Sequence, residues 1–163
     1  MAEYETILTG VEDGIGTITL NRPDVRNSLS SQVLKDLRAA LDDFREDDGV
    51  GVVAFTGAGE KAFAAGADIG ELRQRIFLDA LASAMQAFCD EVEGYGKPTI
   101  AAVNGYALGG GCELAMGSKV SLSPGGGDRR RKGLRRWWEP HRDGYGNVQD
   151  LRAPRVFNRL GKG

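Results

Sequence analysis

The sequence has little of what marks disulfide-bonded, secreted or membrane-spanning proteins. Its 163 residues include only two cysteines, Cys89 and Cys112, which form no disulfide framework and so indicate a reducing, intracellular setting. No apolar run approaches the ~18 residues of a membrane span. The N-terminus, Met-Ala-Glu-Tyr-Glu, is acidic and lacks the basic and apolar regions of a signal peptide. These absences predict a cytoplasmic protein with no membrane partner.

Motifs for nucleotide cofactors are also missing or weak. No Gly-Lys-Ser/Thr occurs, which excludes a P-loop. Gly57-Ala58-Gly59 mimics the start of a dinucleotide fingerprint, but the fingerprint must open a helix and the segment that follows is small and glycine-interrupted. We therefore do not expect a bound dinucleotide.

Charge divides the chain into two different kinds of sequence. Residues 1–117 hold nine Lys/Arg and nineteen Asp/Glu, a net charge of -10, whereas residues 118–163 hold twelve and four, a net charge of +8. The hydrophobic content of 41% and charged content of 27% fit a soluble globular protein. The length is enough for one domain with a core and hardly for two.

Apolar periodicity in the first part predicts alternating strands and helices. Asp13-Gly14 is a hairpin signal between two strand patterns, and Ser30 is a plausible N-cap. The helix after Ser30 carries apolar residues on one face, and so does a second helical pattern over 80–92. The predicted strands are 6–9, 15–20, 50–56 and 99–103. Their order suggests an α/β layer arrangement.

One stretch, Lys97 to Met116, carries the chemistry. The strand that ends before Asn104-Gly105 is followed by the three glycines 109–111 and then by good helix formers. Bare backbone thus leads to a helix N-terminus, where unpaired N–H groups and the positive end of the dipole favour developing negative charge. Glu113 lies in the first helical turn. An N–H cradle beside a carboxylate is suited to carbonyl activation with acid/base chemistry.

The segment Asn104–Ala115 resembles the enoyl-CoA hydratase (crotonase) family, and two other segments support the resemblance. Ala64–Ile69 resembles the second half of that family's oxyanion hole, and Asn21–Ser30 resembles its coenzyme A loop. Taken alone, the first is a small-residue turn and the second a solvated loop. The resemblance implies that the N–H groups of Ala67 and Gly110 hold the thioester oxygen and that Glu113 activates water. The implied substrate-binding residues are Arg22, Arg26, Ala65, Gly66, Ala67, Asp68, Ile69 and Gly110.

The resemblance also implies a fold and a reaction. We expect a truncated α/β crotonase-like spiral of strand–strand–helix repeats over residues 1–117. The expected reaction is syn hydration of a trans-2-enoyl-CoA to a 3-hydroxyacyl-CoA, as in fatty-acid β-oxidation. No cofactor is expected, because coenzyme A is part of the substrate, and the family implies a homotrimer or hexamer.

The hydratase mechanism of the family uses a second glutamate, which lies in a Gln-Pro-Glu setting about twenty residues after the first. No such segment follows Glu113 in this sequence. Hydration by this mechanism uses two acid/base groups, so we expect severely reduced hydratase activity. An enoyl-CoA isomerase or another crotonase-type lyase could use Glu113 alone. A non-catalytic nucleic-acid-binding protein is a third alternative.

That third alternative depends on residues 118–163, which are rich in arginine and glycine and have no family resemblance. Arg129–Lys132 would contact phosphates, with Trp137 and Trp138 stacking on bases. A disordered, solvated tail is the plainer interpretation. The motif and the charge balance change at the same place, which favours a shifted reading frame over both, so nucleic acid is not the expected partner.

Overall fold

The chain forms successive strand–strand–helix repeats in a computed structural model that describes residues 3–68 and 75–122. The first repeat consists of β1, β2 and α1, the second of β3, β4 and α2, and the third of β5, β6 and α3, after which β7 follows. The elements are β1 Ile7–Glu12, β2 Ile15–Leu20, the 3-10 turn η1 Pro23–Val25, α1 Ser31–Glu46, β3 Val52–Gly57, β4 Ala62–Ala64, α2 Arg75–Glu93, β5 Thr99–Ala102, β6 Tyr106–Ala107, α3 Gly110–Gly117 and β7 Val120–Leu122.

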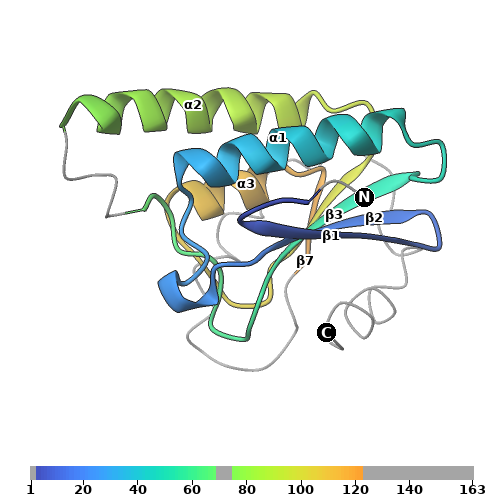
Figure 1. The fold of residues 1–163 in the computed structure, drawn as a ribbon, viewed down its shortest axis with the longest axis horizontal. Helices are drawn as coiled ribbons and strands as arrows, with labels where there is room; N and C mark the ends of the chain where they lie inside the picture. The colour runs from blue at the N-terminus through green and yellow to red at the C-terminus, as the bar shows by residue number, and fades with distance from the viewer. Residues whose placement is uncertain (1–2, 69–74, 123–163) are drawn as a thin grey trace, which may run out of the picture. The chain divides into compact units, whose positions relative to one another are not determined.

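Two sheets share the strands. The larger sheet has the order β1-β2-β3-β5-β7, with β1 antiparallel to β2 and the other neighbours parallel. The smaller sheet pairs β4 with β6 in parallel. In Figure 1, α1 lies between α2 and the strands β1 and β2, and it contacts all three. The repeating order and the mixed sheet confirm the predicted α/β class.

Local signals explain the first repeat. Asp13 and Gly14 adopt φ values of 51° and 79°, the left-handed conformations that a tight two-residue hairpin turn needs. The next strand, β2, spans the predicted residues and buries Ile18 and Leu20. Ser30 caps α1, because its Oγ accepts a hydrogen bond from the Val33 N–H at 3.2 Å.

The predicted apolar faces of both long helices are buried. Tyr95, just after α2, also donates a hydrogen bond to the Leu41 carbonyl of α1 at 2.6 Å. The periodicity therefore identified the core correctly, although α2 begins at Arg75, five residues before the predicted start. The buried residues of these faces are Leu34, Leu37, Leu41 and Phe44 on α1 and Leu81, Met85, Phe88 and Val92 on α2.

Further element boundaries differ from the sequence prediction around the third helix. The third helix begins at Gly110, so two of the three glycines lie inside it. After Gly117, where we expected the family-like part to end, β7 pairs with β5 and aligns Val120 with Ile100. No local sequence pattern predicts either difference. Glycine is a poor helix former, so a helix start at Gly110 is not expected, and β7 is too short, at three residues, to show a strand pattern.

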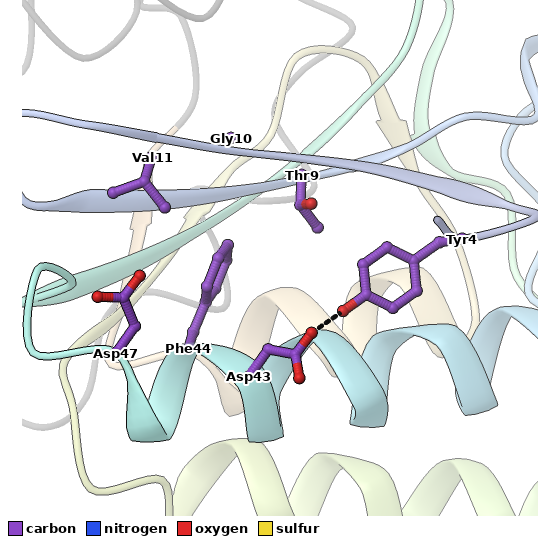
Figure 2. A pocket seen from close by; sticks show the side chains of 7 residues that line it. All are labelled: Tyr4, Thr9, Gly10, Val11, Asp43, Phe44 and Asp47. Atoms are coloured by element: carbon purple, nitrogen blue, oxygen red, sulfur yellow. Dashed lines mark hydrogen bonds between the residues drawn. The ribbon is translucent and has the colours of Figure 1, made fainter. Parts of the chain in front are cut away.

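A small hollow lies between β1 and α1, and no predicted site residue lines it. Figure 2 shows Tyr4 directed at Asp43 across this hollow, with an O–H to Oδ2 distance of 2.6 Å. Burial, and then the hydrogen bond to Asp43, raise the pKa of Tyr4. The Asp47 carboxylate accepts the Gly49 N–H at 2.8 Å. The Tyr4–Asp43 contact ties the N-terminal segment to α1, and the lining residues place the hollow outside the candidate site.

Candidate active site

The two predicted halves of the oxyanion hole meet through a pair of glycines. Gly66 and Gly109 both have positive φ, 89° and 50°. A Cβ on Gly66 would lie 3.0 Å from the Leu108 carbonyl oxygen and 3.7 Å from the Gly109 Cα. Only glycine suits both the backbone angle and the close approach. The residues that follow, Ala67 and Gly110, are thus brought together from the second and third repeats.

Leu29 connects the same two residues from the first repeat. It forms an isolated parallel bridge with Ala67, in which the Leu29 N–H donates to the Gly66 carbonyl at 2.7 Å and the Asp68 N–H donates to the Leu29 carbonyl at 3.0 Å. Its side chain is buried, with Cδ1 3.2 Å from the position of a Cβ on Gly110. No local pattern singles out Leu29, which is one apolar residue before an N-cap.

Some N–H groups around this junction already have acceptors. The Ala65 N–H donates to the Arg26 carbonyl at 3.1 Å, and the Gly111 N–H donates to the Leu108 carbonyl at 3.0 Å. By contrast, in the part of the chain that the structure describes, the N–H groups of Ala67 and Gly110 have no recorded acceptor. The same holds for the glycine before each of them. Unpaired backbone donors of this kind must find another partner, such as water or a ligand.

Glu113 is the acidic residue in the first turn of α3, one turn after Gly110. Its N–H donates to the Gly109 carbonyl at 3.1 Å, and its side chain is exposed. Burial raises the pKa of the Cys89 thiol to about 11, with the charge of Glu113 as the second cause and that of Asp90 as the third. The Glu113 carboxylate is therefore close enough to α2 to influence a buried group there.

The two arginines of the predicted coenzyme A loop differ in their surroundings. Arg26 is exposed and adopts a left-handed φ of 56° at the end of η1. Arg22 is partly buried and forms an ion pair with Asp68, with 2.8 Å between Nη1 and Oδ2. Two predicted binding residues thus bind each other. Ile69, also predicted, lies outside the described residues.

Two asparagines that the sequence analysis did not assign hold the loop between β3 and β4. Asn27 donates to the carbonyls of Ala58 and Ala62 at 3.0 and 2.8 Å. Asn104 donates to the carbonyls of Gly57 and Gly59 at 2.6 and 2.7 Å. This loop leads through β4 into the segment with Ala67. The two side-chain amides therefore help to fix the position of that segment.

The class of protein follows from comparison with known families. The model of the enoyl-CoA hydratase/isomerase family matches residues 10–121, more than half of the chain. The chain therefore belongs to this family. The match runs past the expected boundary at residue 117 and includes most of β7.

Individual relatives are similar to the same part of the chain. A probable enoyl-CoA hydratase of Mycobacterium bovis is 48% identical over 120 residues, which are 74% of this chain and 46% of that protein. The mitochondrial enoyl-CoA hydratase of Pongo abelii is 47% identical over 118 residues, 71% of this chain and 40% of that protein. The chain spans less than half the length of these curated relatives.

Solved structures agree with this assignment. The enoyl-CoA hydratase of Bacillus anthracis matches with a TM-score of 0.70 and 36% identity, covering 73% of this chain and 47% of that one. An enoyl-CoA hydratase/isomerase of Xanthobacter autotrophicus matches with a TM-score of 0.70 and 34% identity, covering 74% and 46%. The predicted crotonase-like fold is confirmed for the part of the chain that these structures cover.

The described residues also bear on metals and membranes. They contain no group of three or more His, Cys, Asp or Glu side chains placed to hold a metal ion. None of the helices in residues 3–68 and 75–122 is both long enough and apolar enough to cross a bilayer.

Proposed function

We propose that this chain binds acyl-CoA thioesters and carries the oxyanion hole of an enoyl-CoA hydratase. The observation that carries the proposal is the junction at Gly66 and Gly109, which brings Ala67 and Gly110 together with N–H groups that have no acceptor in the described residues. Family membership and the names of the relatives support the choice of substrate. The substrate itself supplies coenzyme A, so the proposal requires no further cofactor.

In the proposed mechanism the two N–H groups stabilise negative charge on the thioester oxygen. When water adds to C3 of a trans-2-enoyl-CoA, the electrons of the double bond move toward that oxygen and form an enolate. Each oxyanion-hole donor is typically worth ~3–4 kcal/mol of barrier. Glu113, one turn after Gly110, positions the water and accepts its proton. A proton must then reach C2 on the same face, and this step calls for a second acid.

The sequence after Glu113 contains no Gln-Pro-Glu, so only half of the acid/base pair is identified. We expect the purified 163-residue protein to hydrate crotonyl-CoA at least ~100-fold more slowly than complete hydratases, because a positioned acid/base group typically contributes 10²–10⁴-fold. Loss of the crotonyl-CoA absorbance measures the rate. Glu113→Gln should abolish the residual rate while leaving crotonyl-CoA binding, measured by calorimetry, within about twofold. Hydration at the rate of a complete hydratase would contradict the expected impairment.

An isomerase activity is the second candidate, because Glu113 is the one identified carboxylate and the matched family includes isomerases. A single base can remove a proton from C2 of a 3-enoyl-CoA and return it to C4, with the same oxyanion hole stabilising the enolate. Assays of 3-enoyl-CoA and 2-enoyl-CoA on the same preparation separate the two activities.

A homotrimer or hexamer is the proposed assembly. Three large apolar side chains of the third repeat are exposed in the single chain, namely Tyr106 at 65%, Leu108 at 55% and Met116 at 56%. Contact with a second copy of the chain would cover such side chains, which is the support for this assembly. Analytical ultracentrifugation measures the assembly directly.

A further inference from the structure

We propose that Arg22 and Asp68 are positioning residues that fix the direction of the Ala67 N–H. The inference rests on the proposed function, because it explains how the proposed oxyanion hole is held open. It also assigns Arg22 a role other than the phosphate contact that the sequence suggested. The pair joins the loop before α1 to the segment after β4, which are 46 residues apart in the chain.

The contacts of Arg22 form a small closed network. Its Nη1 lies 2.8 Å from the Asp68 Oδ2, 2.9 Å from the Ser28 carbonyl oxygen and 3.3 Å from the Ser28 Oγ. The Ser28 hydroxyl in turn donates to the same Asp68 Oδ2 at 3.1 Å. The Arg22 and Asp68 side chains are only 26% and 17% exposed. A charge-assisted network of this kind is stronger than an isolated surface ion pair.

The network acts on Ala67 because Asp68 is the next residue. The backbone on both sides of Ala67 is already bonded to Leu29, through the Gly66 carbonyl and the Asp68 N–H. The Arg22–Asp68 contact adds a third anchor through the Asp68 side chain. With its neighbours held at three points, the peptide that contains the Ala67 N–H has little freedom to rotate. A donor fixed in this way needs no reorganisation when charge develops on the thioester oxygen.

A phosphate contact by Arg22 would have a cost. The guanidinium would have to give up its 2.8 Å contact with the Asp68 Oδ2 and its two contacts with Ser28. A charge-assisted contact at a partly buried site is worth more than an exposed ion pair, so giving it up is unfavourable. The exposed Arg26 in the same loop forms no ion pair within the described residues and is the better candidate for the phosphates.

The test compares crotonyl-CoA with free coenzyme A as probes of the intact 163-residue protein. Asp68→Asn and Arg22→Lys should each lower the ratio of the two affinities about 3- to 10-fold, the worth of one neutral hydrogen bond to the thioester carbonyl. All three contacts are made by Nη1; lysine keeps the positive charge but ends in a compact, strongly hydrated ammonium on a flexible stem, so it should hold Asp68 and Ser28 less firmly. The affinity for coenzyme A alone should change less than twofold. With ¹³C at the thioester carbonyl, the infrared stretch of bound crotonyl-CoA should move back toward its value in water.

The matched control is Glu91→Gln. It removes one partner of the Arg38–Glu91 ion pair, 2.9 Å long, which joins α1 to α2 and shares no hydrogen bond or ion pair with the Arg22–Asp68 network. If the loss of any ion pair disturbed the fold enough to change the affinity ratio, Glu91→Gln would change it too. We expect neither the affinity ratio nor the carbonyl stretch of bound crotonyl-CoA to change in Glu91→Gln. The proposal is overturned if Arg22→Lys retains the wild-type affinity ratio and carbonyl stretch, or if Asp68→Asn weakens coenzyme A and crotonyl-CoA equally.

Failure of the proposed function would look different. In that case the wild-type protein binds neither crotonyl-CoA nor coenzyme A, and the positioning role is decided without a ligand. Hydrogen exchange of the Leu29 N–H, which donates to the Gly66 carbonyl, should be about 10-fold faster in Asp68→Asn than in Glu91→Gln, since about 1.4 kcal/mol of lost local stability corresponds to that factor. Equal exchange rates in the two variants would overturn the positioning role.

Discussion

Gly111 lies in the first turn of α3, where a Cβ atom would come within 2.2 Å of the Ala64 carbonyl oxygen and 2.7 Å of the Ala64 Cβ. Its backbone angle does not call for glycine, since its φ is not positive. What the position requires is the absence of a side chain, so that α3 can pack directly on β4. This contact holds the helix that carries Gly110 and Glu113 against the segment that leads to Ala67.

Two effects oppose each other in Gly111→Ala. Alanine is the better helix former by about 1 kcal/mol, but overlap with backbone atoms forces the two elements apart at a cost of typically about 1–3 kcal/mol. Because Ala64 presents rigid backbone rather than a flexible side chain, we expect the overlap to dominate. With the overlap cost at the upper end of its range and the helix gain of about 1 kcal/mol subtracted, the free energy of unfolding should fall by about 1–2 kcal/mol in urea titrations.

Gly96→Ala is the matched control for this substitution. A Cβ on Gly96 meets nothing within 4 Å, and its φ lies outside the positive range. Restricting the unfolded chain should leave stability unchanged or raise it by up to about 1 kcal/mol. A Gly111→Ala variant as stable as Gly96→Ala would show that α3 and β4 do not pack as closely as described.

At the scale of elements, α2 and α3 meet around Cys89. A Cβ on Gly117 would lie 3.3 Å from the Cys89 carbonyl oxygen. The Cys89 side chain is buried, at 8% exposure, and burial followed by the charge of Glu113 raises its pKa from 9.0 to about 11. The pKa of the Cys89 thiol is therefore sensitive to the relative position of α2 and α3.

This pKa difference makes stability depend on pH in one window. Below pH 9 the thiol is protonated in both the folded and the unfolded chain, so it contributes no pH dependence. Between pH 9 and about 11 the unfolded chain loses the proton and the folded chain keeps it, so stability falls as pH rises, by at most about 1.4 kcal/mol per pH unit. Cys89→Ala should flatten the slope of the unfolding free energy in this window.

Glu113→Gln separates the two causes of the shift. The charge of Glu113 raises the pKa of Cys89 less than burial does, so removing this charge should lower that pKa only partly. The pH range over which stability falls should then end at a lower pH. Glu93→Gln, on the same helix as Cys89 but not among the causes of the shift, is the control. Equal slopes in Glu113→Gln and wild type would mean that the carboxylate points away from α2.

Elements with strong local signals were predictable from the sequence. The Asp13-Gly14 turn, the Ser30 cap and the apolar faces of α1 and α2 were identified correctly, because turn chemistry, capping and helical periodicity act over a few residues. The short strands β4, β6 and β7 were not. Each has two or three residues and is defined by its partner strand rather than by its own pattern.

In the candidate site, too, some features were predictable from the sequence and others were not. Ala67, Gly110 and Glu113 were reached through family resemblance, and the structure adds how close the first two segments come. The Arg22–Asp68 pair and the bridge at Leu29 join residues about 40 positions apart. No periodicity connects such residues, so contacts of this range become visible only when the repeats are folded against one another.

On the scale of the whole molecule, the candidate site belongs to no single repeat. Leu29 comes from the first repeat, Ala67 from the second and Gly110 from the third, and they meet where the repeats stack. Stacked repeats bury their faces against their neighbours and depend on one another for stability. The strand that follows the third repeat, β7, pairs with β5 of that repeat. The geometry of the site should therefore depend on β7.

Where the chain is cut should decide whether this arrangement survives. Beyond Gly117, the Lys119 N–H donates to the Thr99 Oγ1 at 3.0 Å, and β7 aligns Val120 and Leu122 with Ile100 and Ala102. A chain ending at residue 117 loses these contacts, whereas a chain ending at residue 123 keeps them. We expect the shorter chain to lose at least about 2 kcal/mol of unfolding free energy, since several hydrogen bonds worth about 1 kcal/mol each disappear.

Urea unfolding followed by circular dichroism compares the two shortened chains with the full one. If residues 124–163 are a tail outside the fold, as the charge reversal indicates, the chain ending at 123 should match the full chain within about 0.5 kcal/mol, the usual scatter of changes outside the packed structure. Equal stability of the two shortened chains would remove β7 from the fold. A large loss in both would show that residues 124–163 stabilise the stacked repeats, and it would contradict the interpretation of this segment as the product of a shifted reading frame.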